Sequence, residues 1–236
     1  MSHWYKKDGA PQYTVIGANG KERDTTLRDA RKLDLVPSVT TILNVAAKPG
    51  LNVWLQQQVL MAALTLPRHE NEAEEAWIER IIQDSKVQTK DAADRGTNMH
   101  DQIEDYFNKK PGDYPDYCKE TYFAVVKEFG NQDWITEQSF ASDLGFGGKV
   151  DLHAKGIVID FKTKERVDDK TAVYDEHAMQ LAAYRVGLGM PEAICANVFV
   201  DLAGNVKIIR HEETEVTKAW DMFMALLSFY RIKNAI

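Results

Sequence analysis

The 236-residue chain has few cysteines, no long apolar run and no excess of positive charge. Its two cysteines, Cys118 and Cys195, are far apart, so they cannot form a zinc site or an iron–sulfur cluster by themselves. No segment approaches the roughly 20 apolar residues that a membrane-spanning helix needs. The first residues lack the apolar core of a secretory signal. We therefore expect a cytoplasmic protein without a membrane partner.

The net charge of −7 argues against a protein that coats nucleic acid by bulk electrostatic attraction. The charge is unevenly spread, because residues 1–50 hold eight Lys and Arg against five Asp and Glu. The remainder of the chain therefore has a net charge of −10. With 44% hydrophobic residues, the chain can bury the core of one domain, or of one domain with an elaboration.

The hydrophobic periodicity changes after Gly130. Before it, a strand and turn at residues 13–20 are followed by helical spacing, and Ser38 is a suitable N-cap. After it, short alternating segments predict strands. We expect helices at residues 39–47, 51–66, 70–90, 92–109, 117–129, 171–187 and 215–232, and strands at 134–140, 146–153, 157–163, 194–201 and 206–210.

This order of elements predicts an α/β (α+β) fold with a mixed central sheet flanked by helices. Residues 1–90 would form an N-terminal strand, turn and helical elaboration. Residues 91–236 would form the core, and the two parts together would make one compact domain.

The most informative stretch is the predicted hairpin of residues 146–163. If residues 155–156 form a two-residue turn, Asp151 faces Asp160, about 5 Å away, with Lys162 on the same face. A one-residue slip would mix the apolar and polar faces, so the pattern selects this register. Two converging carboxylates favour a hard cation such as Mg²⁺ or Mn²⁺. A solvated face with weak ion pairs would show the same pattern.

These residues resemble a known signature. Asp151, eight residues and then Asp160-Phe161-Lys162 resemble the PD-(D/E)xK motif of nucleases, with Val150 in place of the usual proline.

Three further segments resemble parts of RecB-like nucleases. They are Arg95-Gly96-Thr97 with His100 before the sheet, Gln180 with Tyr184 after it, and the segment Pro37–Leu43. The last resembles the start of phage exonucleases and of the mitochondrial genome maintenance exonuclease family. Order and approximate spacing agree over residues 37–200.

The resemblance implies a restriction-endonuclease-like core and a metal-dependent DNA exonuclease that leaves 5′-phosphates, acting in phage or bacterial DNA recombination, repair or replication. It implies that Asp151 and Asp160 ligate Mg²⁺ or Mn²⁺, with His100 and the backbone carbonyl of Phe161 as further ligands. Lys162 would orient or deprotonate the attacking water.

The resemblance also assigns supporting roles. Gln180 and Tyr184 would position the water, the lysine or a phosphate, and Arg95, Lys164 and Arg185 would contact phosphates. Some similar nucleases hold an iron–sulfur cluster on four cysteines, which this chain lacks, so no cluster is expected. Partners would be a DNA end or single strand, and a recombinase or single-strand-binding protein. The location would be the cytoplasm of a bacterial host if the chain is phage-encoded.

Other interpretations of the same residues remain open. The chain fits a structure-specific endonuclease of the same fold, an inactive module that binds DNA ends or a recombination partner, or a small-molecule metal hydrolase. His100 also fits the border of a helical core stripe, and Gln180 with Tyr184 fits an ordinary intrahelical contact.

Overall fold

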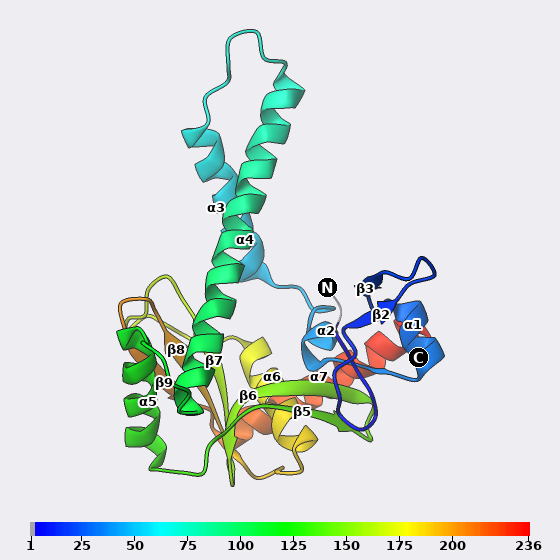
Figure 1. Ribbon diagram of the computed structural model, residues 1–236, viewed down its shortest axis with the longest axis vertical. Coiled ribbons are helices and arrows are strands. Elements are labelled where there is room, and N and C mark those ends of the chain that lie inside the picture. The colour runs from blue at the N-terminus through cyan, green and yellow to red at the C-terminus, as the bar shows by residue number, and fades with distance from the viewer. Residues whose placement is uncertain (1–2) are drawn as a thin grey trace. The chain divides into compact units, whose positions relative to one another are not determined.

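The computed structural model describes residues 3–236 (Figure 1). The chain divides into two compact units, one formed by residues 1–46 and 100–236 and the other by residues 47–99. Among the described residues, no helix combines the length and apolar character that crossing a membrane requires.

A five-stranded sheet is the centre of the larger unit. Its order is β5-β6-β7-β8-β9, and only β7 and β8 run parallel among these neighbours. A parallel pair needs a crossover, and α6 (Asp175–Gly187) provides it between β7 and β8. The strands are β5 (Ile135–Ser142), β6 (Phe146–Ala154), β7 (Ile157–Thr163), β8 (Ile194–Val200) and β9 (Val206–Arg210). The predicted mixed sheet flanked by helices is confirmed.

Helices cover both faces of this sheet. On one face, α6 packs against β5 to β8, and α7 (Glu213–Asn234) packs against α6 (Figure 1). A further helix, α5 (Asp116–Phe129), packs against β8 and β9. Phe161 of β7 contacts Phe107, the last residue of α4 (Glu74–Phe107), whereas Val158 belongs to the core cluster with α6 and α7. Because side chains alternate along a strand, these contacts lie on opposite faces.

The first 46 residues belong to the unit that contains the sheet. Here α2 packs against α6, α7 and β6, and Trp4 and Val39 are buried in the core. Ser38 caps α2 as expected, since its hydroxyl accepts a hydrogen bond from the Thr41 amide at 3.0 Å. The elements are β1 (Trp4–Tyr5), β2 (Thr14–Ile16), β3 (Glu22–Asp24), α1 (Leu27–Leu33), β4 (Val36–Pro37) and α2 (Val39–Leu43).

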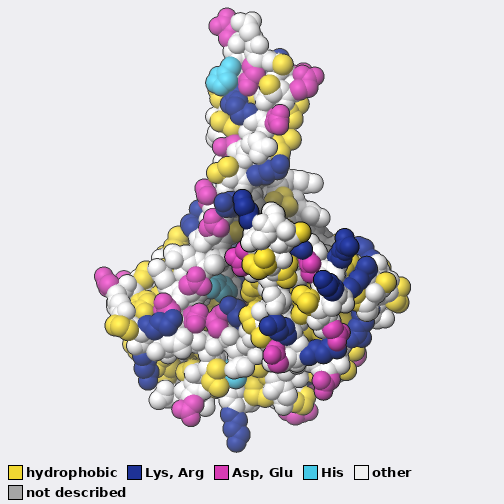
Figure 2. Space-filling view, turned by 45° about the vertical axis from the view of Figure 1, so that its right-hand side comes forward, with side chains coloured by type: hydrophobic (Ala, Val, Ile, Leu, Met, Phe, Trp, Pro, Cys, Tyr) yellow, Lys and Arg dark blue, Asp and Glu magenta, His cyan; other side chains and the backbone are white. Residues whose placement is uncertain are grey.

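The smaller unit contains α3 (Pro49–Thr65) and the first part of α4. The indole nitrogen of Trp77 donates to the Leu66 carbonyl at 2.8 Å and ties the two helices together. No residue of α3 is charged, and Figure 2 shows hydrophobic side chains at the surface between charged ones. Leu60 and Leu64 are among those exposed.

Two expected features differ from the structure. The predicted helices at 70–90 and 92–109 are one helix, α4, so the expected break was wrong and the expected boundary at residue 90 lies inside a helix. No proline separates the two segments, and polar residues alone do not end a helix. In addition, α2 ends at Leu43 and not at residue 47 as expected, because the amides of Val45 and Ala46 bond three residues back, which tightens the chain into a turn.

Candidate active site

The hairpin of β6 and β7 has the predicted register. Leu152 lies opposite Ile159, and this is the ladder pair farthest from the hairpin turn. Continuing the same register places Asp151 opposite Asp160. The Asp151 carboxylate accepts a hydrogen bond from the Phe161 amide at 2.8 Å, so a side chain takes the place of a ladder bond there. The strands therefore separate at the two acids.

The other side of Asp151 is also irregular. The ladder between β5 and β6 includes the pairs on both sides of Glu137 and Asp151 but omits this one. Glu137 has a φ of 54°, which is uncommon for a residue with a Cβ, and it forms an ion pair with Lys149. Irregular backbone of this kind often marks functional sites. The sequence assigned no role to Glu137.

Asp160 is a deeply buried carboxylate, with 1% of its surface exposed. Its Oδ2 lies 2.6 Å from the Lys162 ammonium and accepts a hydrogen bond from the Asn197 amide at 2.8 Å. Burial raises the pKa of Asp160 to about 6, against the attraction of Lys162 and with a contribution from the charge of Asp151. The ionised form therefore depends on a nearby cation.

A chain of hydrogen bonds joins β7 to α6 at this point. Lys162 donates to Oε1 of Gln180 at 3.1 Å, and Nε2 of Gln180 donates to the Tyr184 hydroxyl at 2.8 Å. Burial, with the charges of Asp160 and Asp151, raises the pKa of Tyr184 well above its usual value. Gln180 and Tyr184 do form an intrahelical contact, and Lys162 connects it to the acids.

His100 approaches the same acids from α4. Its Nδ1 lies 3.6 Å from Oδ2 of Asp151, and its ring meets the ring of Phe161 edge-on, with centroids 6.2 Å apart. As the side chains stand, the described residues contain no group of three His, Cys, Asp or Glu side chains arranged to hold a metal ion.

The residue types nevertheless fit a divalent cation. Two carboxylates, one imidazole and a backbone carbonyl are suitable ligands for Mg²⁺ or Mn²⁺. Two ligands at about 2.1 Å from one ion stand roughly 3 to 4 Å apart, which accommodates His100 and Asp151. In this structure Lys162 supplies the positive charge beside Asp160.

The three expected phosphate contacts have different environments. Arg95 is exposed on α4, in the unit of residues 47–99. Lys164 is half-buried over the rings of Tyr174 and Phe199, and burial, followed by the charge of Lys162, lowers its pKa.

Arg185 lies inside the protein. It is buried and forms two hydrogen bonds of 2.8 Å with the Glu213 carboxylate, which ties α6 to α7. The phosphate contact expected for Arg185 would require this pair to open.

Two residues of the site were missed in the sequence. Asn197 of β8 lies beside Asp160 in the parallel register, and His211 contacts Asn197 at 2.7 Å. Asn197 did carry a signal, because it is a single amide in an apolar strand and such a group needs a partner. His211 follows β9 without any recognisable pattern.

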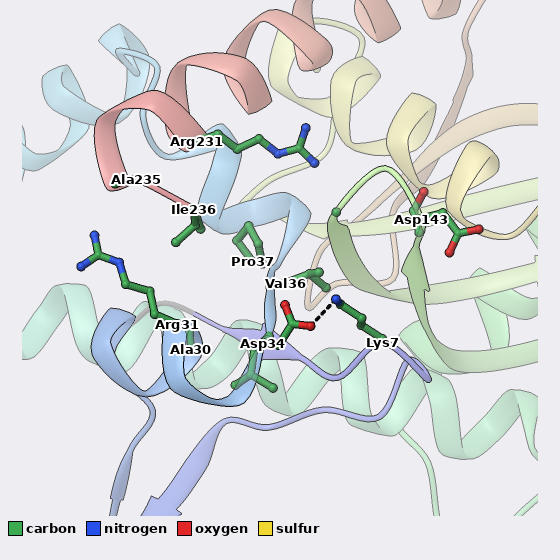
Figure 3. Close-up of a pocket in the computed structure, with 13 residues that line it drawn as sticks. Lys7, Ala30, Arg31, Asp34, Val36, Pro37, Asp143, Arg231, Ala235 and Ile236 are labelled. Carbon is green, nitrogen blue, oxygen red and sulfur yellow. Dashed lines mark hydrogen bonds and ion pairs between the residues drawn. The ribbon is translucent and has the colours of Figure 1, made fainter.

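A cavity of about 580 Å³ lies elsewhere in the larger unit (Figure 3). Its lining includes Lys7, Arg31 and Arg231, and all three cations are already engaged. Lys7 pairs with Asp34, as Figure 3 shows, and the two arginines donate to backbone carbonyls. None of the predicted site residues lines this cavity.

No protein-family model matches the chain, and no curated protein matches it. Solved structures do. One is a proposed exonuclease from Eubacterium rectale, with 14% identity and a TM-score of 0.40, over 56% of this chain and 65% of that chain. Another is an alkaline exonuclease from Laribacter hongkongensis, with 14% identity and a TM-score of 0.35, over 84% and 92%. This likeness concerns the fold, and the case for a function rests on the site.

Proposed function

We propose that the chain is a metal-dependent DNA exonuclease of the PD-(D/E)xK type, which hydrolyses phosphodiester bonds and leaves 5′-phosphates. The observation that carries the proposal is the buried Asp160 carboxylate, bonded to Lys162 beside Asp151. A solvated face of weak ion pairs would leave both acids in water. The approach of His100 to Asp151 supports the same conclusion.

The proposed metal ligands are Asp151, Asp160, His100 and the backbone carbonyl of Phe161. A bound Mg²⁺ or Mn²⁺ would supply positive charge for the phosphate and a more acidic water. The resident side chains account for the rest of the chemistry.

As an ammonium, Lys162 would neutralise charge on the phosphate and orient the attacking water, and as the neutral amine it would deprotonate that water. Its ammonium only donates, so Gln180 must turn its oxygen to Lys162 and its amide nitrogen to Tyr184. The Tyr184 hydroxyl then accepts from Gln180 and keeps its own proton for another acceptor. The pKa of Tyr184 is raised, so its hydroxyl stays protonated at neutral pH. This hydroxyl would donate a hydrogen bond to a phosphate oxygen or to the water.

We propose exonuclease rather than internal cleavage because residues 47–99 form a helical unit separate from the sheet. In the nucleases that the sequence resembles, added N-terminal helices admit a DNA end or single strand. Roles in phage or bacterial recombination, repair or replication, a recombinase or single-strand-binding partner, and a cytoplasmic location belong to the same proposal.

The test is digestion of end-labelled linear DNA, single- and double-stranded, beside closed single-stranded circles, with Mg²⁺, Mn²⁺ or EDTA. We expect linear DNA to be degraded only with metal and circles to stay intact. Cut circles would indicate an endonuclease of the same fold. Intact DNA in every reaction with metal would overturn the proposal in favour of a binding module, and hydrolysis of a small phosphodiester alone would indicate a small-molecule hydrolase.

A further inference from the structure

A buried chain of hydrogen bonds leads from Asp160 through Asn197 to His211. Nδ2 of Asn197 donates to Oδ2 of Asp160 at 2.8 Å, and Nε2 of His211 lies 2.7 Å from Oδ1 of Asn197. Asn197 is fully buried and His211 is 8% exposed. The chain therefore lies within the protein, where each polar atom needs a partner.

The direction of each bond is determined by chemistry. The Asp160 carboxylate accepts, so Asn197 must present its amide nitrogen to it and its oxygen to His211. His211 must then carry its proton on Nε2. Burial lowers the pKa of His211, which favours the neutral ring with Nδ1 unprotonated. Glu215, at 3.9 Å from Nδ1, is too far for a hydrogen bond.

The backbone holds the three residues in place. The parallel register of β7 and β8 sets Asp160 beside Asn197. The amide of His211 donates to the Cys195 carbonyl of β8 at 2.9 Å, which fixes the main chain next to His211. Asn197 and Lys162 both contact Oδ2 of Asp160, so the carboxylate is held from two directions.

We propose that Asn197 and His211 are positioning residues for the proposed nuclease. Asn197 sets the rotation of the Asp160 carboxylate, and His211 sets the orientation of the Asn197 amide. Without them, Lys162 would remain as the charged partner of Asp160, and the carboxylate would rotate toward the ammonium and away from a metal-binding orientation. The inference rests on the proposed function, because it assigns these residues to a metal ligand of that site.

The test compares Asn197→Leu, His211→Leu and His211→Gln with the wild-type protein. Mn²⁺ binding is measured by calorimetry without DNA, and kcat, the KM for DNA and the Mg²⁺ concentration for half-maximal rate are measured with it. Loss of a partner behind a metal ligand costs about 10- to 100-fold in metal affinity or activity. We expect a loss of this size for Asn197→Leu with an unchanged KM, and a smaller loss for His211→Leu.

His211→Gln is the decisive variant, because its amide can donate to Asn197 and should restore metal binding and rate. Thr121→Val serves as a control for buried hydrogen bonds and should behave as the wild type. Within residues 3–236, the Thr121 hydroxyl bonds only to the Tyr117 carbonyl of α5. Circular dichroism establishes that each variant is folded.

Wild-type metal binding and rate in folded Asn197→Leu would overturn the inference. So would a His211→Gln protein as defective as His211→Leu. The proposed function is judged separately on the wild-type protein: if that protein neither binds Mn²⁺ nor degrades DNA, both proposals fall, whereas an active wild type with unaffected variants removes only the positioning roles.

Discussion

The Asp160 carboxylate shows how single residues support one another at this site. One of its oxygens contacts both Lys162 and Asn197, and almost none of its surface reaches water. An ionised carboxylate in such a place is costly unless it is paired and hydrogen-bonded. Lys162 is therefore needed both for the resting charge balance and for the proposed chemistry.

We predict that Lys162→Gln lowers kcat by about 10²- to 10⁴-fold, the usual range for loss of a group that transfers protons. The glutamine removes the ammonium but can still bond to Gln180. Initial rates on labelled linear DNA measure the effect. Lys155→Gln, in the exposed turn of the same hairpin, should keep the wild-type rate. Equal rates for Lys162→Gln and Lys155→Gln would contradict the assignment.

His153 gives a prediction about pH. It is buried on β6, both of its ring nitrogens lack a hydrogen-bond partner among the described residues, and burial lowers its pKa. In the unfolded chain this histidine takes up a proton near pH 6.5, whereas in the folded chain it does so only at a lower pH. The free energy of unfolding therefore falls as the pH drops below about 6.5.

We expect His153→Leu to reduce the loss of stability between pH 7.5 and pH 5, measured as the shift in the urea midpoint. The exposed His69 supplies the control, and His69→Gln should lose as much as the wild type. The explanation fails if His153→Leu is as sensitive to acid as the wild-type protein.

Part of this site could be predicted from the sequence. Asp151, Asp160 and Lys162 were identified because alternation fixes the faces of a short hairpin. Asn197 and His211 were not, because the contact of Asn197 with Asp160 and that of His211 with Asn197 depend on which strands become neighbours after the α6 crossover. Strand spacing does not determine that order. The pairing of Arg185 with Glu213 was not predicted either, because the position of Arg185 next to Tyr184 in the sequence does not show this partner.

Among the elements, β5 and α6 meet at a position that tolerates no side chain. A Cβ on Gly187 would overlap the ring of Phe140, which itself packs edge-on against Tyr184. The last turn of α6 thus approaches the sheet closely. This contact fixes the position of α6, the helix that contains Gln180 and Tyr184.

We predict that Gly187→Ala destabilises the protein by about 1–3 kcal/mol through overpacking. This is the opposite of the gain of about 1 kcal/mol that alanine gives over glycine in an open helix. Urea unfolding measures the change, and adding Phe140→Leu should recover part of the loss by making space. A Gly187→Ala protein as stable as the wild type would show that the contact is not tight.

The boundaries of α3, α5 and α7 were predicted closely, whereas α2 and α6 were predicted too long and α1 was not predicted. The strands β7 and β9 begin and end at the predicted residues, since apolar alternation and turns delimit them. The division of α4 into two helices failed because the interruption of its apolar stripe between the two segments does not by itself interrupt a helix.

For the whole molecule, the net charge of −7 limits how DNA can be held. In the proposed exonuclease, DNA binding would depend on a few local cations and on the proposed metal. The logarithm of the affinity then falls linearly with the logarithm of the salt concentration, and the slope is proportional to the number of phosphates contacted. Arg95 and Lys164 are the more accessible of the three proposed phosphate contacts, since Arg185 is buried and paired with Glu213.

We predict that Arg95→Ala and Lys164→Ala each raise the KM for DNA, leave kcat unchanged and reduce the slope of log KM against log salt by about 1. Kinetics between low and moderate salt give this slope. Arg185→Met should keep the wild-type KM and slope and instead lower the unfolding midpoint. An unchanged slope in both alanine variants would remove them from the DNA contact.

We propose that the buried Asp160 is the residue on which metal-dependent exonuclease activity depends most directly. The most direct measurement compares wild type, Asp160→Asn and the exposed control Asp133→Asn on end-labelled linear DNA and closed circles with Mg²⁺. We expect wild type and Asp133→Asn to degrade linear DNA and spare circles. Folded Asp160→Asn should be at least about 100-fold slower, since a ligand of the catalytic metal is lost. Degradation by Asp160→Asn at the wild-type rate would contradict it.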